Sequence, residues 1–127
     1  MLVEFTVANY LSFKEPATLS LAAGKLSEDH TCNVFTAKKT ELLKSVVIYG
    51  ANASGKSNLI NAMGFMRNLI LHSFRDAELD KDIPVNRFRL STVTEKKPSF
   101  FEIIFIHEEI KYRYGFEVDR EKVHSEW

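Results

Sequence analysis

The chain has 127 residues and a mass of 14.6 kDa, which leaves room for one compact domain at most. Hydrophobic residues make up 45% and charged residues 27%, and these values exclude a disordered or low-complexity chain. Seventeen basic and seventeen acidic residues cancel, so the overall charge gives no case for a nucleic-acid or membrane surface. The single cysteine, Cys32, excludes an intramolecular disulfide and is predicted to be a buried, inert thiol.

The N-terminal segment carries no targeting or membrane signal. Residues 1–10 have no cationic region and include Glu4, and no apolar run approaches the roughly 18 residues of a membrane span. We therefore expect a cytoplasmic protein with no membrane partner.

Alternating apolar residues predict several β-strands. Residues 3–7 and 18–22 alternate with a period of two, which is typical of half-buried strands. The polar stretch 24–44 is interpreted as a long loop that holds one short strand at 33–36. Further strands are predicted at 85–90, 100–106, 110–118 and 123–127, with a hairpin between 100–106 and 110–118.

A continuous apolar run precedes a helical pattern. Val46, Val47, Ile48 and Tyr49 lead to Gly50, as expected for a strand buried on both faces at the centre of a sheet. From Lys56 the period changes to about 3.6, which predicts an amphipathic helix of roughly five turns. Its apolar stripe comprises Leu59, Ile60, Met63, Met66, Ile70 and Phe74, and the two methionines are interpreted as core residues.

Residues 50–57, GANASGKS, match the phosphate-binding pattern G-x-x-x-x-G-K-[ST] at every fixed position. In such a loop the chain leaves a strand, wraps backbone amides around phosphate groups, and enters a helix whose N-terminus favours an anion. Lys56 is the predicted catalytic residue, because its ammonium group would reach the β- and γ-phosphates, and the Ser57 hydroxyl would bind Mg²⁺. The sequence therefore predicts binding of a purine nucleotide together with Mg²⁺. The predicted nucleotide-binding residues are Gly50, Ala51, Asn52, Ala53, Ser54, Gly55, Lys56, Ser57 and Asn58.

Three stretches also resemble a known family. They read LVEFTVANYLSFKEPATLSL, VVIYGANASGKSNLINAM and PSFFEIIFIHEEIKYRYGFEVDREKVHSEW. In this order, over nearly the whole chain, they resemble the N-terminal part of bacterial AAA-family ATP-binding proteins with an ABC-type ATPase head. That group is related to structural-maintenance-of-chromosomes, RecF and overcoming-lysogenization-defect proteins. Its loop often reads GxNGSGKS, so Ala53 stands where a glycine is common.

The resemblance implies a fold, partners and site residues. The fold is α/β (α+β mixed sheet), the N-terminal lobe of a P-loop NTPase head in which antiparallel strands flank the P-loop strand and helix. In such proteins two heads dimerise around ATP. DNA is an expected partner of the full-length protein only, which would act in DNA maintenance or antiphage defence. Ser12, Phe13 and Lys14 are implied on the base and sugar side of the nucleotide, although core packing is favoured for Phe13.

Several residues that this class needs for hydrolysis are missing from the sequence. The chain has no glutamine, and its five glycines include no Gly-Gly pair for a signature motif. His107, Glu108 and Glu109 follow an apolar run, but an imidazole is a poor Mg²⁺ ligand, so they are interpreted as a solvated hairpin tip. We therefore expect residues 1–127 to be a partial ATP-binding domain that binds ATP without hydrolysing it alone. Apolar surface at Trp127, Phe100 and Ile104 favours self-association, such as a homodimer.

Two other functions remain open at this point. A small P-loop kinase or phosphotransferase would need lid arginines, for which the candidates are Arg67, Arg75, Arg87 and Arg89. A non-catalytic interaction module would bind nucleotide only to stabilise an assembly.

Overall fold

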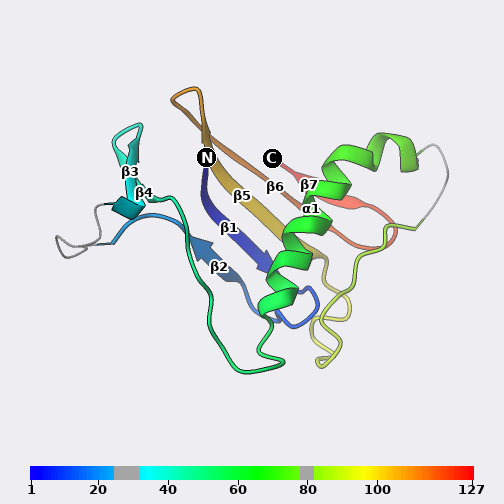
Figure 1. Cartoon of the computed structure of the whole chain (residues 1–127). Helices are drawn as coiled ribbons and strands as arrows, with labels where there is room; N and C mark the ends of the chain where they lie inside the picture. The colour runs from blue at the N-terminus through cyan, green and yellow to red at the C-terminus, as the bar shows by residue number, and fades with distance from the viewer. Residues whose placement is uncertain (25–31, 78–81) are drawn as a thin grey trace.

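The structure, a computed structural model, describes residues 1–24, 32–77 and 82–127, with the backbone alone for 73–77. The elements in chain order are β1 (Leu2–Ala8), β2 (Ala17–Ser20), β3 (Val34–Ala37), β4 (Thr40–Leu43), α1 (Lys56–Ala77), β5 (Ser99–His107), β6 (Ile110–Val118) and β7 (Val123–Glu126) (Figure 1). The strand predictions at 3–7, 18–22, 100–106, 110–118 and 123–127 are confirmed, with ends shifted by a few residues.

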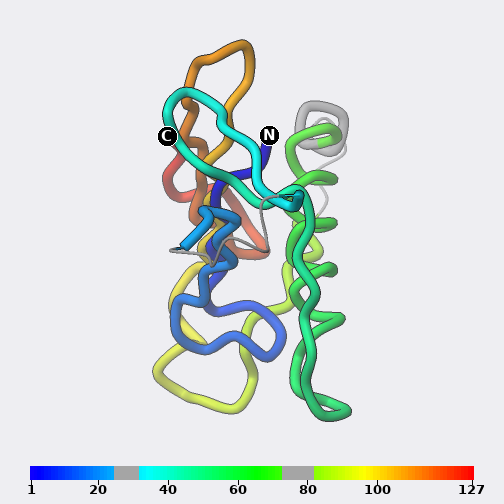
Figure 2. The backbone as a smooth tube through the Cα atoms, turned by 60° about the vertical axis from the view of Figure 1, so that its left-hand side comes forward, coloured from blue at the N-terminus to red at the C-terminus, as the bar shows by residue number. Residues whose placement is uncertain are grey.

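One antiparallel sheet carries α1 on one of its faces. The strand order is β2-β1-β5-β6-β7, and each neighbouring pair is antiparallel. Figure 2 shows the sheet and the helix as two layers. Side chains alternate between the two faces of each strand, and on β1, β5 and β6 one of these faces packs into the buried core with the helix. The fully or nearly buried core comprises Phe5, Val7, Tyr10, Ala62, Met66, Val85, Phe101, Phe116 and Val118.

The buried stripe of α1 differs in part from the predicted stripe. Met63 and Met66 pack on the core as predicted, whereas Ile60 is 65% exposed and Ile70 is 47% exposed. The contacting stripe follows the i, i+3, i+4, i+7 spacing from Leu59, and Ile60 lies about 100° further round the helix. Ala62, Phe65 and Leu69 complete the contact with the sheet, and the side chain of Phe74 lies outside the described residues.

The prediction that Val46–Tyr49 form a buried central strand is wrong. Among the described residues these four belong to no strand, and their side chains are between 43% and 89% exposed. The five strands of the large sheet already pair with one another, and the segment between β4 and α1 lies on the helix side of that sheet (Figure 2). The described sheets are antiparallel throughout, so the predicted mixed sheet around a P-loop strand is not observed there.

The stretch interpreted as a long loop contains a hairpin of two strands. The short strand near 33–36 is confirmed as β3, but β4 was not predicted. The buried Leu42 and Ala37 of this hairpin pack against Val3 and Ile106 of the large sheet, and this contact holds the hairpin against the sheet. Each strand has four residues, too few for a period to stand out in the sequence. Cys32, just before β3, is exposed, so the prediction of a buried thiol is wrong.

The β5–β6 connection is a solvated hairpin tip, as predicted. Its two central residues, Glu108 and Glu109, have φ angles of 47° and 60°, which is the pattern of a type I′ turn. The side chains of His107 and Glu108 are exposed. The Glu109 carboxylate accepts a hydrogen bond of 3.1 Å from the backbone N–H of Lys38 and so links the two hairpins.

Asn9, at the end of β1, holds the connection between α1 and β5 in place. Its buried Nδ2 donates to the carbonyls of Thr94 (3.0 Å) and Lys97 (2.8 Å), and its Oδ1 accepts from the N–H of Phe88 (3.2 Å). The strand predicted at 85–90 is therefore wrong, because this segment bonds to the side chain of Asn9 and to the β1 turn instead of to a ladder. Asn9 has a φ of 50°, a conformation that asparagine tolerates better than most residues.

Trp127 packs on the sheet face opposite α1. It is 39% exposed, its ring lies 5.6 Å from that of Phe100, and its Nε1 donates to the Glu102 carboxylate at 3.0 Å. Ile104 packs against the β3–β4 cluster, so the exposed apolar patch is smaller than the sequence suggests. Within residues 1–24, 32–77 and 82–127, no helix has both the length and the apolar character needed to cross a bilayer.

Replacing Asn9 by alanine tests the clamp. We expect Asn9→Ala to lower the free energy of unfolding by about 3 kcal/mol, because it leaves buried carbonyls without donors and forces alanine into a left-handed conformation. Urea denaturation followed by circular dichroism measures this change. The exposed Asn68→Ala is the control and should change stability by less than about 0.5 kcal/mol. Equal losses in the two variants would contradict the clamp.

A second prediction concerns the turn between β6 and β7. A hydrogen bond from His124 (2.7 Å) and the N–H groups of Lys122 and Glu121 lower the pKa of Asp119 from 3.8 to about 2. Because the pKa is lower in the folded state, ionised Asp119 stabilises the fold above about pH 4, and this contribution is lost as the pH falls towards 2. Asp119→Asn should therefore be less stable than the wild type at pH 7, with a difference that shrinks between pH 4 and 2. Urea midpoints measured across this range, with the exposed Asp82→Asn as control, would refute the idea if the difference stayed constant.

Candidate nucleotide-binding site

The GANASGKS loop leads directly into the N-terminus of α1. The carbonyl of Gly55 accepts from the N–H groups of Asn58 (3.0 Å) and Leu59 (3.2 Å) and so closes the first turn of the helix. The N–H groups of Gly55, Lys56 and Ser57 have no acceptor among the described residues. Three free donors therefore sit at the positive end of a 22-residue helix, which is a favourable environment for an anion.

Lys56 folds back over the loop. Its Nζ donates to the carbonyls of Gly50 and Ala51, each at 2.7 Å, and lies 3.4 Å from the Ser54 hydroxyl. An ammonium group has three protons, so the loop itself supplies a partner for each of them. The positive charge of Lys56 is thereby held next to the loop that, according to the motif, would bind phosphate groups.

The backbone of the loop explains where small residues are needed. Gly55 has a φ of 92°, and a Cβ at this position would come within 2.8 Å of the Ser12 hydroxyl. A Cβ on Gly50 would come within 2.7 Å of the Ser54 hydroxyl. Ala53 has a φ of 63°, in the left-handed region where an L-residue is strained, and this explains why a glycine is common at that position in the resembling sequences.

The turn after β1 contacts the loop from the side. The Asn58 Nδ2 donates to the Ser12 hydroxyl at 2.9 Å, and the same hydroxyl lies beside Gly55. Of the three residues implied on the base and sugar side, Ser12 is thus next to the loop. Phe13 packs against the core, as favoured from the sequence, and the exposed Lys14 lies 3.9 Å from the Glu15 carboxylate.

A groove that sequence reasoning did not identify adjoins this contact. It has a volume of about 470 Å³ and is lined by Ser12 and Asn58 on one side and by Arg87 and Arg89 on the other. The segment 86–90 reaches this position because the N–H of Leu11 donates to the carbonyl of Asn86 at 2.8 Å. The alternating basic residues of RFRL are the one signal for it in the sequence.

The other predicted residues lie in the loop and in the first turn of α1, and their roles remain predictions. Gly50 to Ser54 and Ser57 are exposed, and Gly55, Lys56 and Asn58 are half-buried. In the part of the chain that is described, no group of three or more His, Cys, Asp or Glu side chains could hold a metal ion. Of the lid candidates for a kinase, Arg67 lies exposed on α1, and the side chain of Arg75 is outside the described residues.

The loop, the open helix N-terminus and the lysine above it define a P-loop domain of the nucleotide-binding class. The family model described as "AAA domain, putative AbiEii toxin, Type IV TA system" matches residues 45–127, which is more than half of the chain. The protein belongs to this family of AAA-type P-loop ATPase domains. No curated protein and no solved structure matches the chain.

The strain at Ala53 leads to a prediction. We expect Ala53→Gly to raise the free energy of unfolding by about 0.5 kcal/mol, because relief of the left-handed strain exceeds the added flexibility of the unfolded chain. Ala51→Gly is the matched control, since Ala51 does not have a positive φ, and it should destabilise by about 0.5 kcal/mol. Thermal unfolding of both variants provides the measurement, and a loss of stability in Ala53→Gly equal to that in Ala51→Gly would argue against the strain.

Proposed function

We propose that this protein binds ATP with Mg²⁺ through residues 50–58, as the N-terminal lobe of an ABC-type ATPase head. One observation carries the proposal. The N–H groups of Gly55, Lys56 and Ser57 are without acceptors in the described part of the chain, and the Lys56 ammonium lies directly above the loop that precedes them. A triphosphate supplies the negative oxygens that would satisfy both sets of donors.

Each residue has a defined part in binding. Lys56 would exchange two carbonyl partners for phosphate oxygens, which bear more negative charge and form stronger hydrogen bonds. The exposed Ser57 hydroxyl fits a Mg²⁺ ligand, since Mg²⁺ in nucleotide sites takes few protein oxygens and completes its shell with phosphate and water. When bound, Mg²⁺ would supply charge neutralisation for the phosphates.

The described residues also support an incomplete site for hydrolysis. The acidic pair Glu108–Glu109 lies at the hairpin tip, at the opposite end of the molecule from the N-terminus of α1 (Figures 1 and 2). It therefore does not serve as the Mg²⁺-binding and water-activating pair of this site. Exposed apolar side chains on Val46–Tyr49 and on α1, at Ile60 and Leu71, are consistent with cover from a further part of an ATPase head.

The family description supports our proposal for the biological role. That description names a toxin of a type IV toxin–antitoxin system, which favours a defensive role, such as antiphage defence, over DNA maintenance. We also propose that the head self-associates, for example as a homodimer. The ATP bound to one copy would then lie against the second copy of the chain.

Thermal shift with Mg-ATP tests nucleotide binding. At a ligand concentration 100 times Kd, the wild type should gain about 2.7 kcal/mol of stability, seen as a rise in Tm. Lys56→Ala should lose this shift, because it removes the ammonium group that would bind the phosphate oxygens. Lys111→Ala, an exposed lysine on β6, is the matched control and should keep it.

Two results would contradict the proposal. No shift in the wild type would refute nucleotide binding, and an equal shift in Lys56→Ala would refute the role of the loop lysine. Steady release of phosphate from ATP by the pure 127-residue chain would overturn the incomplete site.

A further inference from the structure

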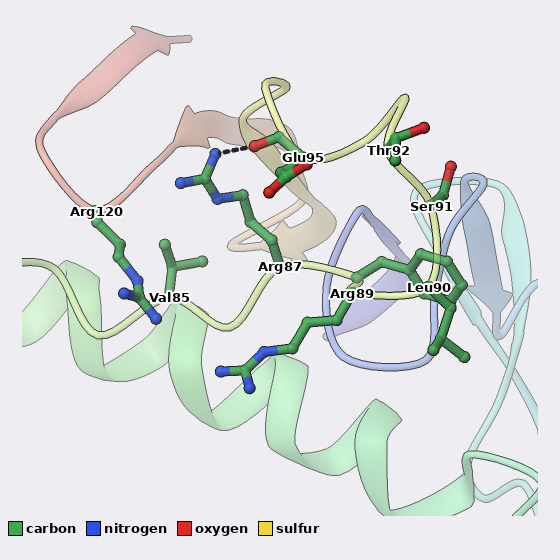
Figure 3. Close-up of a pocket in the computed structure, with 9 residues that line it drawn as sticks. Val85, Arg87, Arg89, Leu90, Ser91, Thr92, Glu95 and Arg120 are labelled. Carbon is green, nitrogen blue, oxygen red and sulfur yellow. Dashed lines mark hydrogen bonds between the residues drawn. The ribbon is translucent and has the colours of Figure 1, made fainter.

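A second basic site lies beyond the candidate nucleotide loop. A cavity of about 550 Å³ is lined by the guanidinium-bearing residues Arg87, Arg89 and Arg120, together with the polar Ser91, Thr92 and Glu95 (Figure 3). These residues come from two segments that are far apart in the sequence. The overall charge of zero therefore conceals a local excess of three cationic side chains over one carboxylate.

Both segments are held by specific contacts. The loop that carries Arg87 and Arg89 is fixed by Asn9, whose Oδ1 accepts from the N–H of Phe88 between them. Arg120 sits in the turn that the Asp119 carboxylate caps through two backbone N–H groups. The two segments meet directly, because the N–H of Ile83 donates to the carbonyl of Arg120 at 2.8 Å.

The three arginines differ in their hydrogen bonds and in their exposure. Arg87 Nη1 donates to the carbonyl of Glu95 at 2.6 Å and is half-buried at the cavity wall. Arg89 and Arg120 are exposed, and within residues 1–24, 32–77 and 82–127 neither guanidinium forms an ion pair with a carboxylate. Two acids flank Arg120 in the sequence. Asp119 is bonded to His124, and among the described residues Glu121 forms no ion pair. Figure 3 shows the side chains of Arg89 and Arg120 extending to one side of the loop, whereas Arg87 extends to the other side, toward Glu95.

The chemistry of this cavity selects a phosphate group. A guanidinium is always charged and presents paired N–H donors that match two oxygens of a phosphate, and hydroxyl groups add further donors. We propose that Arg89 and Arg120, with Arg87 at the wall, bind a phosphoryl group in this cavity. None of residues 50–58 lines the cavity, and Arg87 and Arg89 also line the neighbouring groove beside Ser12 and Asn58. The group belongs either to a nucleic-acid backbone or to a small phosphate compound, and these two sources share the same recognition chemistry.

Nuclear magnetic resonance locates the site without relying on nucleotide binding. The 127-residue chain with Lys56→Ala is titrated with inorganic pyrophosphate, and the Nε–Hε signals of the arginines are followed. We expect saturable shifts at Arg89 and Arg120, and about tenfold weaker binding in Arg89→Gln and in Arg120→Gln. Arg67→Gln removes the same charge from an exposed position on α1 and should leave the affinity unchanged.

A second measurement separates the two sources. Fluorescence anisotropy with a labelled single-stranded oligothymidylate is recorded over a salt series for the wild type and for the Arg89→Gln/Arg120→Gln double variant. A nucleic-acid backbone predicts that the double variant binds more weakly and that the slope of log K against log salt falls by about 0.7 for each lost contact. Pyrophosphate shifts at the arginines without oligonucleotide binding assign a small phosphate compound.

Other outcomes overturn the site. Arginine signals that stay unmoved by both probes, or a double variant that binds both as well as the wild type, would exclude it. The substituted side chains are exposed, and circular dichroism together with an unchanged urea midpoint would show that the double variant is folded. Loss of the Mg-ATP shift in Lys56→Ala, with the arginine shifts intact, separates this site from the proposed nucleotide site.

Discussion

The carboxamide of Asn9 is the contact that joins the parts of this molecule around its candidate sites. It leaves the sheet at the end of β1, donates to the carbonyls of Thr94 and Lys97, and accepts from the N–H of Phe88. Two residues further on, the backbone of Leu11 bonds to Asn86, and Ser12 bonds to Asn58 on α1. A single turn therefore sets the position of the basic loop 86–90 against the start of the helix. Since all of these partners are backbone or short side chains, little adjustment is available if the turn moves.

The candidate loop combines backbone N–H donors that have no acceptor among the described residues with an ammonium group that is bonded to the loop itself. Lys56 donates to the carbonyls of Gly50 and Ala51, while the first amides of the helix have no acceptor among the described residues. These carbonyls partly offset the desolvation of the ammonium group, so under the proposed function a phosphate would compete with two neutral oxygens rather than with bulk water. Positive φ angles at Ala53 and Gly55 bend the backbone into this shape.

Local sequence patterns predicted the strands of the large sheet. They failed for segments whose structure depends on contacts with distant residues. Alternation along β1 and β6 identified these two strands, because one face of each packs on the core and the period of two survives in the sequence. The apolar run Val46–Tyr49 has the composition of a central strand, yet no described strand pairs with it. Segment 85–90 also has strand composition, but its hydrogen bonds go to Asn9 and Leu11. Pairing partners lie tens of residues away and leave no local trace.

By itself, the sequence determined the phosphate-binding motif, the helix that follows it and the sheet strands, since loop spacing and side-chain period are local properties. It also showed the solvated tip at Glu108–Glu109. Only the tertiary structure decided that Ser12 touches the loop, that β3 and β4 cover Ile104, and that Arg120 shares a cavity with Arg87 and Arg89. The physical reason is the same in each case. These contacts join segments far apart in the chain, and they form only when burial of the common core brings those segments together.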